Sequence, residues 1–523
     1  MGGGQRYTVS TSNLLVIWGG ERNTRPVSTV SAVLVAVMAQ RILSVMMSYV
    51  VPVCVLFIPV PVIIYFLLKY WLRKRNKSKL LHLTEGERQK VVTVGLFHPY
   101  CNAGGGGERV LWCAIRALQN RYPFVRCIVY TGDANTTGSE ILLKAQQRFN
   151  IKVPKDVEFV FLKKRHLVEA DMYPYFTLLG QSVGSVILAW EAMLNYIPDV
   201  YIDTMGYAFT IPLFKFMGGC KVGAYVHYPT ISTDMLTRVQ ERTATYNNAG
   251  FISRSPVLSY GKLLYYKLFA YLYGMAGKRC DVIMVNSTWT FGHIVDLWTS
   301  CETTHVVYPP CDTKAFLELP LERNTKGPLS IVSIAQFRPE KDHPLQVKAF
   351  AKFLDSVDGN DTEKEKYQLI LVGSCRNAED AQRVDNLKDL CNVLKVQNNV
   401  QFKLNVAFSD LKQHMAEATA GLHTMWNEHF GIGVVELMAA GTVILAHNSG
   451  GPKLDIVIEY NEKPTGFLAD SEETYAEKMA AIFKLTEQER LEYSINARES
   501  VTRFSEEEFE VGFLNSTEVL FRG

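Results

Sequence analysis

The residues with the clearest chemical meaning lie in the last third of the chain. Glu428 and Glu436 stand eight positions apart and are separated by a turn that contains Gly431 and Gly433. Glu436 falls at the start of a predicted helix, where its carboxylate can accept hydrogen bonds from ribose hydroxyls while the helix N-terminus binds phosphate. Glu428 lies in the preceding loop, where it can face a sugar. This spacing predicts a binding site for a nucleotide sugar.

A pair of cations precedes these carboxylates. Arg338 and Lys341 follow an apolar run, 329–336, that is predicted to be a strand. Open α/β sheets bind their ligands at the carboxyl ends of the strands. Two cations there suit a departing diphosphate, whose negative charge grows as the glycosidic bond breaks. The alternative is a solvated charged turn, which explains the cations alone but not their combination with the glutamates.

A second glycine turn extends the predicted donor site. Residues 440–455 again combine a strand with a glycine turn, which places Ser449 near the donor, although a plain turn is the alternative. The predicted donor-binding residues are Glu436, Phe430, Gly431, Ile432, Gly433, Ser449 and Gly450.

Earlier in the chain, four consecutive glycines join a predicted strand to a predicted helix. These are Gly104, Gly105, Gly106 and Gly107. Their backbone N–H groups can bind a diphosphate, or their lack of side chains can let the acceptor approach closely. The loop is neither a Walker A motif nor a dinucleotide fingerprint, so a tight strand-to-helix turn is the alternative.

One histidine completes the predicted catalytic set. His227 closes an apolar run in the first half of the chain, where it can bond sugar hydroxyls or polarise the acceptor. A lone histidine is more often structural, so His227 counts as a site residue only beside the other loops. The predicted catalytic residues are therefore Glu428, Arg338, Lys341 and His227.

The sequence contains no recognisable metal-binding motif. No Asp-x-Asp occurs anywhere in the chain, so the usual carboxylate pair for a nucleotide-bound Mg²⁺ or Mn²⁺ is missing. The 10 cysteines include no Cys-x-x-Cys pair. We therefore expect a metal-independent reaction without a cofactor, in which Arg338 and Lys341 neutralise the diphosphate.

These loops need two parallel sheets to position them. After residue 90, short β-rich runs alternate with helical stretches, which is typical of α/β domains. The predicted strands are 91–97, 126–130, 157–162, 200–202, 222–227, 282–286 and 305–308 in a first series, and 329–336, 368–372, 400–403, 421–424 and 443–446 in a second. The polar, proline-marked stretch 319–328 separates the series, so catalysis is expected between two Rossmann-like domains.

An N-terminal membrane anchor is predicted over 46–72. Its apolar run is long enough to cross a bilayer, which takes about 20 residues. The basic cluster 73–79 follows, and the positive-inside rule places it and the catalytic domains in the cytosol. The shorter apolar stretch 27–39 is interpreted as part of the extension, with a signal-peptide core as the alternative. The aromatic-rich segment 256–277 fits either a monotopic membrane contact or a buried helix.

The charge of the chain bears on whether it binds nucleic acid. Lys and Arg number 55 against 52 Asp and Glu, which leaves a net charge of only +3. So small a charge gives no reason to expect nucleic acid as a partner.

Glu428, Glu436, Arg338 and Lys341 together resemble the E-x7-E signature and phosphate clamp of the retaining family 4 glycosyltransferases of GT-B architecture. A closer similarity, over nearly everything after the predicted anchor, is to the eukaryotic α-1,2-mannosyltransferases that act on a dolichol-linked trimannoside. The motifs that carry it are HPYCNAGGGGERVLWCA, GYAFTIPLFK, VHYPTISTDML, QFRPEKDHPLQ and HTMWNEHFGIGVVE. The long extension upstream of residue 90 departs from that family.

The resemblance implies a reaction and its partners. GDP-mannose would donate two successive α-1,2-linked mannoses, with retention, to the dolichol-diphosphate-linked trimannosyl oligosaccharide in N-glycan precursor assembly. The implied setting is the endoplasmic reticulum membrane, with one N-terminal anchor and cytosolic catalytic domains. The implied partners are GDP-mannose, the dolichol-linked oligosaccharide, the lipid bilayer and other mannosyltransferases of the dolichol pathway.

The domain organisation that follows is GT-B. It comprises an extension (1–45), the anchor (46–72), a basic linker (73–90), an N-terminal acceptor-facing and membrane-facing domain (91–318), a C-terminal donor domain (328–495) and a C-terminal helix (496–523) that packs back on the N-terminal domain. Two alternatives remain open: a related family 4 enzyme with another donor such as UDP-N-acetylglucosamine, and a catalytically silent scaffold of a glycosylation complex.

Overall fold

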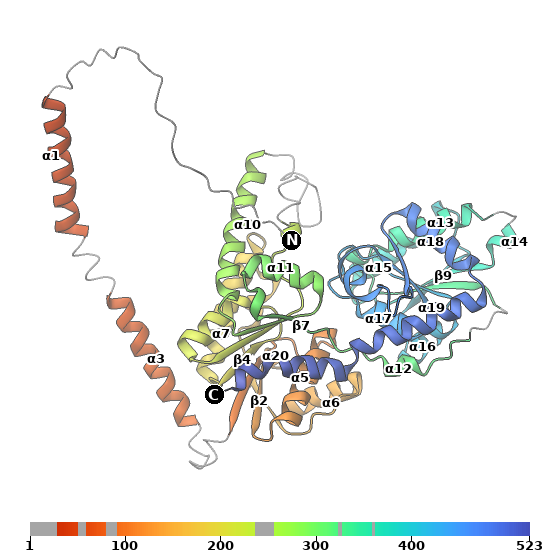
Figure 1. Ribbon diagram of the computed structural model, residues 1–523, viewed down its shortest axis with the longest axis horizontal. Helices are drawn as coiled ribbons and strands as arrows, with labels where there is room; N and C mark the ends of the chain where they lie inside the picture. Colours follow the sequence, from red (N-terminus) through yellow and green to blue (C-terminus); the bar gives the residue numbers. More distant parts are fainter. Residues whose placement is uncertain are drawn as a thin grey trace, which may run out of the picture. The chain divides into compact units, whose positions relative to one another are not determined.

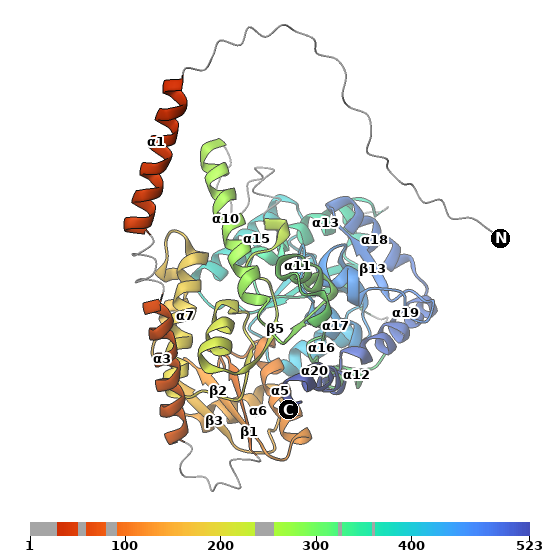
Figure 2. The same ribbon diagram turned by 60° about the vertical axis from the view of Figure 1, so that its left-hand side comes forward.

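Figures 1 and 2 show a computed structural model of the chain. It describes residues 29–50, 59–79, 91–235, 256–322, 327–357 and 361–522. The chain divides into two compact units, Met1–Tyr70 and Trp71–Gly523. The second unit contains two parallel sheets, which is the two-domain α/β architecture predicted from the sequence.

The first sheet has seven strands in the order β3-β2-β1-β4-β5-β6-β7, and all of its pairs are parallel. The strands are β1 (Val92–Phe97), β2 (Val125–Thr131), β3 (Val157–Phe161), β4 (Val200–Asp203), β5 (Lys221–Val226), β6 (Val282–Val285) and β7 (Thr304–Val306). Helices cover both faces of the sheet, so the central strands are apolar along most of their length. The strand order reverses direction between β1 and β4.

The second sheet repeats this plan with six strands in the order β10-β9-β8-β11-β12-β13. They are β8 (Leu329–Ile334), β9 (Tyr367–Gly373), β10 (Val400–Leu404), β11 (Ala420–Leu422), β12 (Val443–His447) and β13 (Gly466–Ala469). Here the reversal falls between β8 and β11, and in open α/β sheets ligands bind outside the carboxyl ends of the strands at such a point.

All twelve predicted strands are present, within a few residues of their predicted ends. One further strand, β13, was not predicted; it is the edge strand that pairs with β12 from Ile444↔Gly466 to His447↔Ala469. Its four residues are too few to show a clear alternation, and two of them, Gly466 and Ala469, have low strand propensity.

The helices connect these strands. Those of the first sheet are α5 (Gly106–Arg121), α6 (Gly138–Phe149), α7 (Thr177–Asn195), α10 (Pro256–Gly277) and α11 (Thr288–Trp298). Those of the second part are α12 (Lys314–Leu317), α13 (His343–Asp355), α14 (Asp361–Lys364), α15 (Ala378–Val393), α16 (Phe408–Glu417), α17 (Ile432–Ala439), α18 (Glu472–Lys484), α19 (Glu487–Ser500) and α20 (Glu506–Phe521).

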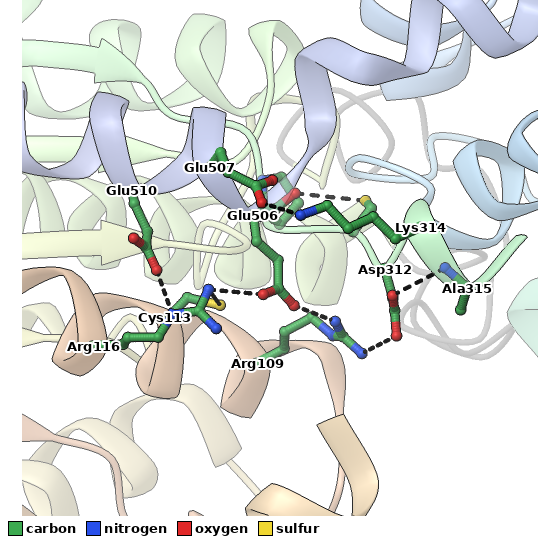
Figure 3. Close-up of polar contacts among 11 residues, drawn as sticks. Arg109, Cys113, Arg116, Asp312, Lys314, Ala315, Glu506, Glu507 and Glu510 are labelled. Carbon is green, nitrogen blue, oxygen red and sulfur yellow. Dashed lines mark hydrogen bonds and ion pairs between the residues drawn. The ribbon is translucent and has the colours of Figure 1, made fainter. Parts of the chain in front are cut away.

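The last helix, α20, lies along α5 of the first sheet (Figure 1). Its buried Phe509, Phe513 and Leu520 join the apolar core of that sheet. Figure 3 shows the polar side of the contact, where Arg116 binds Glu506 at 2.7 Å and Glu510 at 2.5 Å. The last helix, which follows the second sheet in the chain, thus packs on the domain of the first sheet.

Removal of the Arg116 guanidinium should weaken this attachment. Arg116→Ala leaves the mostly buried Glu510 without its cation and Glu506 with Arg109 alone, and we expect a loss of about 1–2 kcal/mol in unfolding free energy, measured by chemical denaturation. Arg522→Ala is the matched control, since Arg522 pairs with Glu518 on the exposed surface and its loss should cost almost nothing. Equal losses for both variants would contradict the structural role of the Arg116 pairs.

The predicted anchor over 46–72 does not form one helix of the described residues. Met46–Val50 is a short π-helix, 51–58 lie outside the described residues, and α3 (Pro59–Lys79) runs directly into the basic cluster. In the described part of the chain, α7 is the single helix long and apolar enough to cross a membrane, and 39% of its most apolar window is buried in the protein. Within the described residues, the expectation of an N-terminal transmembrane helix is corrected for α3, because its charges shorten its apolar part.

Most of the predicted extension 1–45 lies outside the described residues. Its apolar stretch is part of α1 (Thr29–Val45), which ends where the π-helix begins. The basic linker is described only as far as Lys79, where α3 ends.

Candidate functional site

The site forms at the carboxyl edge of the second sheet. Arg338 and Lys341 follow β8, Glu428 follows β11, and Ser449 follows β12. These three strands are neighbours and parallel, so their carboxyl ends meet at one edge beside the reversal of strand order. The topology therefore brings together loops that are more than 80 residues apart in the chain.

An ion pair lies at the centre of this edge. Lys341 Nζ donates to Glu428 Oε2 at 2.5 Å, and His423 Nε2 lies 3.1 Å from the same oxygen. His423 follows the last residue of β11 and is only 7% exposed. This histidine is not among the predicted site residues, although its position directly after a strand and shortly before Glu428 could have indicated it.

These contacts keep Glu428 ionised. Burial alone would raise the pKa of its carboxyl, but the hydrogen bond with His423 and the charge of Lys341 hold that pKa well below its usual range. A fixed carboxylate of this kind can accept a hydrogen bond from a sugar hydroxyl.

The glycine turn after β12 is hydrogen-bonded to the loop that contains Glu428. Ser449 Oγ accepts a hydrogen bond from the backbone N–H of Asn427 at 2.7 Å, and Gly451 N–H donates to the carbonyl of Glu428 at 2.8 Å. Gly450 has a φ of +60°, and a Cβ there would lie 2.3 Å from that carbonyl oxygen. Only glycine allows so close an approach at this position, which gives Gly450 a structural role in addition to its predicted one.

Glu436 occupies a different position in its helix from the one predicted. α17 begins at Ile432, capped by Gly431 in a left-handed conformation with φ of +114°, so Glu436 lies one turn inside rather than at the start. Burial raises the pKa of its carboxyl to about 7, against a lowering by Arg109 and a further rise from Asp312. Phe430 is buried beneath this turn, and Gly433 lies in the first turn of the helix.

This pKa predicts a pH dependence of donor binding. If ionised Glu436 accepts the ribose hydroxyls, the KM for the nucleotide sugar should fall roughly tenfold between pH of about 6 and about 8, because the carboxyl loses its proton as pH rises through about 7. In Glu436→Gln the KM should be high at both values. Asp203 also has a pKa raised by burial to about 7. An unchanged slope in Glu436→Gln would therefore assign the titration to another group.

Arg338 is the one predicted catalytic cation that the structure does not bring to Glu428. Its Nη1 lies 3.7 Å from Glu340 Oε1, and its buried Nε has no hydrogen-bond partner. A buried donor without a partner costs stability, of the order of 1–3 kcal/mol. A diphosphate oxygen is a suitable acceptor for this group.

The glycine loop after β1 differs from its prediction in one respect. The N–H groups of Gly104 and Gly105 already donate to Glu108 Oε1, at 2.5 and 3.4 Å. An anion at these two groups would have to displace a carboxylate of the same chain. Gly106 and Gly107 instead begin α5, and a Cβ on Gly106 would lie 2.8 Å from the side chain of Ile432 at the start of α17.

His227 lies beside this loop, 3.4 Å from where a Cβ of Gly107 would be. Its Nε2 lies 3.1 Å from the carbonyl oxygen of Thr204, to which it donates. Burial lowers the pKa of His227 to about 4, so the ring is neutral near pH of about 7. A neutral imidazole in this place can accept a proton or a hydrogen bond through Nδ1.

Residues on both sides of Glu428 contact the first sheet's domain. Asn427 Nδ2 donates to Asp234 Oδ2 at 2.7 Å, and the rings of His429 and Tyr228 have centroids 4.1 Å apart. Glu428 therefore lies where the two domains meet, as expected for chemistry between a donor domain and an acceptor domain.

Known proteins are similar to this chain in sequence and in fold. A family model described as the ALG11 mannosyltransferase N-terminus matches residues 91–298, and one described as glycosyl transferases group 1 matches residues 320–500. A mouse protein named GDP-Man:Man(3)GlcNAc(2)-PP-Dol alpha-1,2-mannosyltransferase is 58% identical over 452 residues, which cover 86% of this chain and 91% of the relative. The human protein of that name is 57% identical over 450 residues, with the same two coverages.

Solved structures agree on the fold. The structure of Anabaena HepE with UDP and glucose has a TM-score of 0.54 at 14% identity, and OtsA has a TM-score of 0.58 at 11% identity. Each match covers 82% of this chain and 99% of the other. The fold is GT-B, and the chain belongs to the family of GDP-Man:Man(3)GlcNAc(2)-PP-Dol alpha-1,2-mannosyltransferases.

Proposed function

We propose that this glycosyltransferase moves mannose from GDP-mannose to the dolichol-diphosphate-linked trimannosyl oligosaccharide and adds two α-1,2-linked residues in sequence. The observation that carries the proposal is the 58% identity to a relative of that activity, which extends over both domains and not over one motif. It includes the loops that hold Lys341 and Glu428. Donor and product would then share the α configuration, so the transfer proceeds with retention.

The mechanism we propose is attack from the face of the leaving group. The departing diphosphate takes the proton of the acceptor hydroxyl as the new glycosidic bond forms. Lys341 and Arg338 neutralise the charge that develops on the diphosphate, and Glu428 orients the mannose. The transition state has oxocarbenium character, as in other glycosyl transfers. Glu428 as a covalent nucleophile is the weaker possibility, since its contacts with Lys341 and His423 hold it as a hydrogen-bond acceptor.

Metal independence is part of the same proposal. The chain contains no Asp-x-Asp, and two cations take the place that a divalent ion has in other transferases. We expect full activity in a chelator.

We further propose that the protein works at the cytosolic face of the endoplasmic reticulum membrane, because its acceptor is a lipid. Helix α10 supports a membrane contact. One face of it packs into the core through Tyr266, Phe269 and Tyr273, while the opposite face exposes an apolar stripe at helical spacing. That stripe consists of Tyr260, Leu264, Leu268, Tyr271 and Met275, all between 45% and 71% exposed.

For segment 256–277 the sequence left open a buried helix or a membrane contact. The buried reading applies to one face of α10, and the membrane contact is proposed for the opposite face. Figure 2 shows its upper part standing clear of the sheet. An apolar stripe of this length, with the exposed Lys267 on the same face, is suited to the interface of a bilayer, where a lysine can reach the headgroups.

A donor panel tests the function. The full chain in detergent is incubated with a synthetic trimannosyl lipid diphosphate and, separately, GDP-mannose, UDP-N-acetylglucosamine or UDP-glucose, each with a chelator. Transfer from GDP-mannose alone is expected. Transfer only from a UDP-sugar would refute the donor, and transfer only when Mg²⁺ or Mn²⁺ is restored would refute metal independence.

A further inference from the structure

His423 and Lys341 bind the same oxygen of the Glu428 carboxylate. Lys341 Nζ and His423 Nε2 both bind Oε2, and neither binds Oε1. Two donors on one oxygen fix the rotation of the carboxylate group and leave its other oxygen directed elsewhere. This geometry is that of a carboxylate held for a third partner.

The direction of the hydrogen bond follows from the state of Glu428. An ionised carboxylate has no proton and only accepts, so His423 must donate through Nε2–H. In the neutral ring, Nδ1 then carries a lone pair. That atom is buried and has no hydrogen-bond partner. The hydroxyl of Tyr475 donates at 3.0 Å to the backbone carbonyl of His423 and not to its ring.

Local packing does not explain a histidine at this position. The residue follows β11, whose three residues are all buried, and its backbone N–H continues the pairing with β12 by donating to Leu445. An apolar side chain would avoid the buried, unpartnered Nδ1, which a stable interior normally excludes. What the imidazole adds is the bond to Glu428.

Lys341 alone cannot hold the Glu428 carboxylate in place throughout the reaction. The proposed function requires its ammonium group to turn towards the diphosphate as negative charge develops there. A lysine side chain is long and flexible, whereas His423 is anchored in the sheet by its backbone hydrogen bond and by burial. Once Lys341 moves, His423 is the donor that remains on Oε2.

We propose that His423 is a positioning residue for glycosyl transfer, which holds Glu428 Oε2 through Nε2–H so that Oε1 faces the transferred sugar while Lys341 serves the diphosphate. The inference rests on the proposed role of Glu428 but not on the identity of the donor sugar. His423 itself touches no substrate.

Two variants of His423 separate this role from a purely structural one. His423→Leu removes the donor and fills the site with an apolar side chain, and we expect kcat to fall about 10- to 100-fold, as for the loss of one hydrogen bond to a charged group, with the KM for the donor nearly unchanged. His423→Gln places an amide N–H close to the position of Nε2 and should recover at least half of that loss on a logarithmic scale. His414→Leu, on α16 of the same domain, is the control and should keep the wild-type kcat.

A double variant tests whether His423 acts through Glu428. In the Glu428→Gln background, His423→Leu should lower the residual kcat by less than threefold, because the group that it positions is already changed. Independent, multiplying losses would overturn the proposal. So would a wild-type kcat in His423→Leu, or equal losses in the Leu and Gln variants accompanied by a lower melting temperature.

A wrong donor assignment can be told apart from a wrong role of His423. If the wild-type chain transfers nothing from GDP-mannose, the donor assignment is wrong. The same variants are then compared with the nucleotide sugar that the wild type does use, and the ratio of the Leu and Gln variants decides the role of His423 there.

Discussion

Lys341→Ala should lower kcat about 100- to 1,000-fold. Lys341 is the charge closest to Glu428, at 2.5 Å, and it lies at the sheet edge where the diphosphate is proposed to leave. Removing one donor to a developing negative charge typically costs a factor of this size. The KM for GDP-mannose should rise far less, because the charge of the diphosphate increases mainly in the transition state. Steady-state kinetics at saturating acceptor measure both constants.

Lys348→Ala is the matched control for this variant. Lys348 belongs to the next helix of the same domain and pairs with Glu472 at 3.2 Å on the exposed surface. We expect its removal to leave kcat within twofold of wild type. A Lys341→Ala enzyme with the wild-type kcat would contradict the assigned role, and a rise in KM alone would show that Lys341 only binds the donor.

Glu428→Gln should be at least as damaging, with kcat lowered about 1,000-fold. The amide keeps the shape of the side chain but replaces an anion that accepts from both Lys341 and His423. It also leaves the ammonium of Lys341 without its buried counter-charge, and one amide oxygen cannot orient the sugar as a fixed carboxylate does. Product formation measured by mass spectrometry gives the rate.

The fold of this variant needs a separate check. A circular dichroism spectrum and a melting temperature close to those of wild type would show that the loss is chemical. Glu472→Gln, which changes an exposed carboxylate in the same domain, should retain activity. A Glu428→Gln enzyme with more than a tenth of the wild-type kcat would exclude Glu428 from the central role.

The sequence was sufficient to predict the two sheets and the edge at which the loops converge. Apolar runs such as 329–336 and 443–446 have the length and composition of buried parallel strands, and the site loops follow directly from them. Parallel topology then requires Lys341 and Glu428 to lie at one edge. Their predicted roles in catalysis remain predictions, but their proximity is a structural fact.

Three features of the site depend on local backbone geometry that residue types and spacing alone do not fix. Glu108 folds back on the glycine loop and takes the N–H groups of Gly104 and Gly105. α17 begins four residues before Glu436, since Gly431 provides the left-handed cap that starts the helix. His423 approaches Glu428 only because the chain turns sharply after β11.

The membrane segment shows a different limit of sequence reasoning. Hydropathy over 46–72 averages across three prolines and the start of a basic cluster, whereas the helix that forms there begins at Pro59 and ends in that cluster. The helix of the described residues with the length and composition of a span is α7, in the first sheet's domain. Contact with a bilayer is therefore a proposal, and it rests on the proposed lipid acceptor and on the exposed stripe of α10.

The most direct test of the account is the product formed by the full wild-type chain from GDP-mannose and a trimannosyl lipid diphosphate in the presence of chelator. Mass spectrometry is expected to show acceptor enlarged by one and then by two hexoses, and an α-1,2-specific mannosidase should remove both. An unchanged acceptor, an addition that the mannosidase leaves intact, or an equal yield from the Glu428→Gln chain would contradict the proposed donor, linkage or site, respectively.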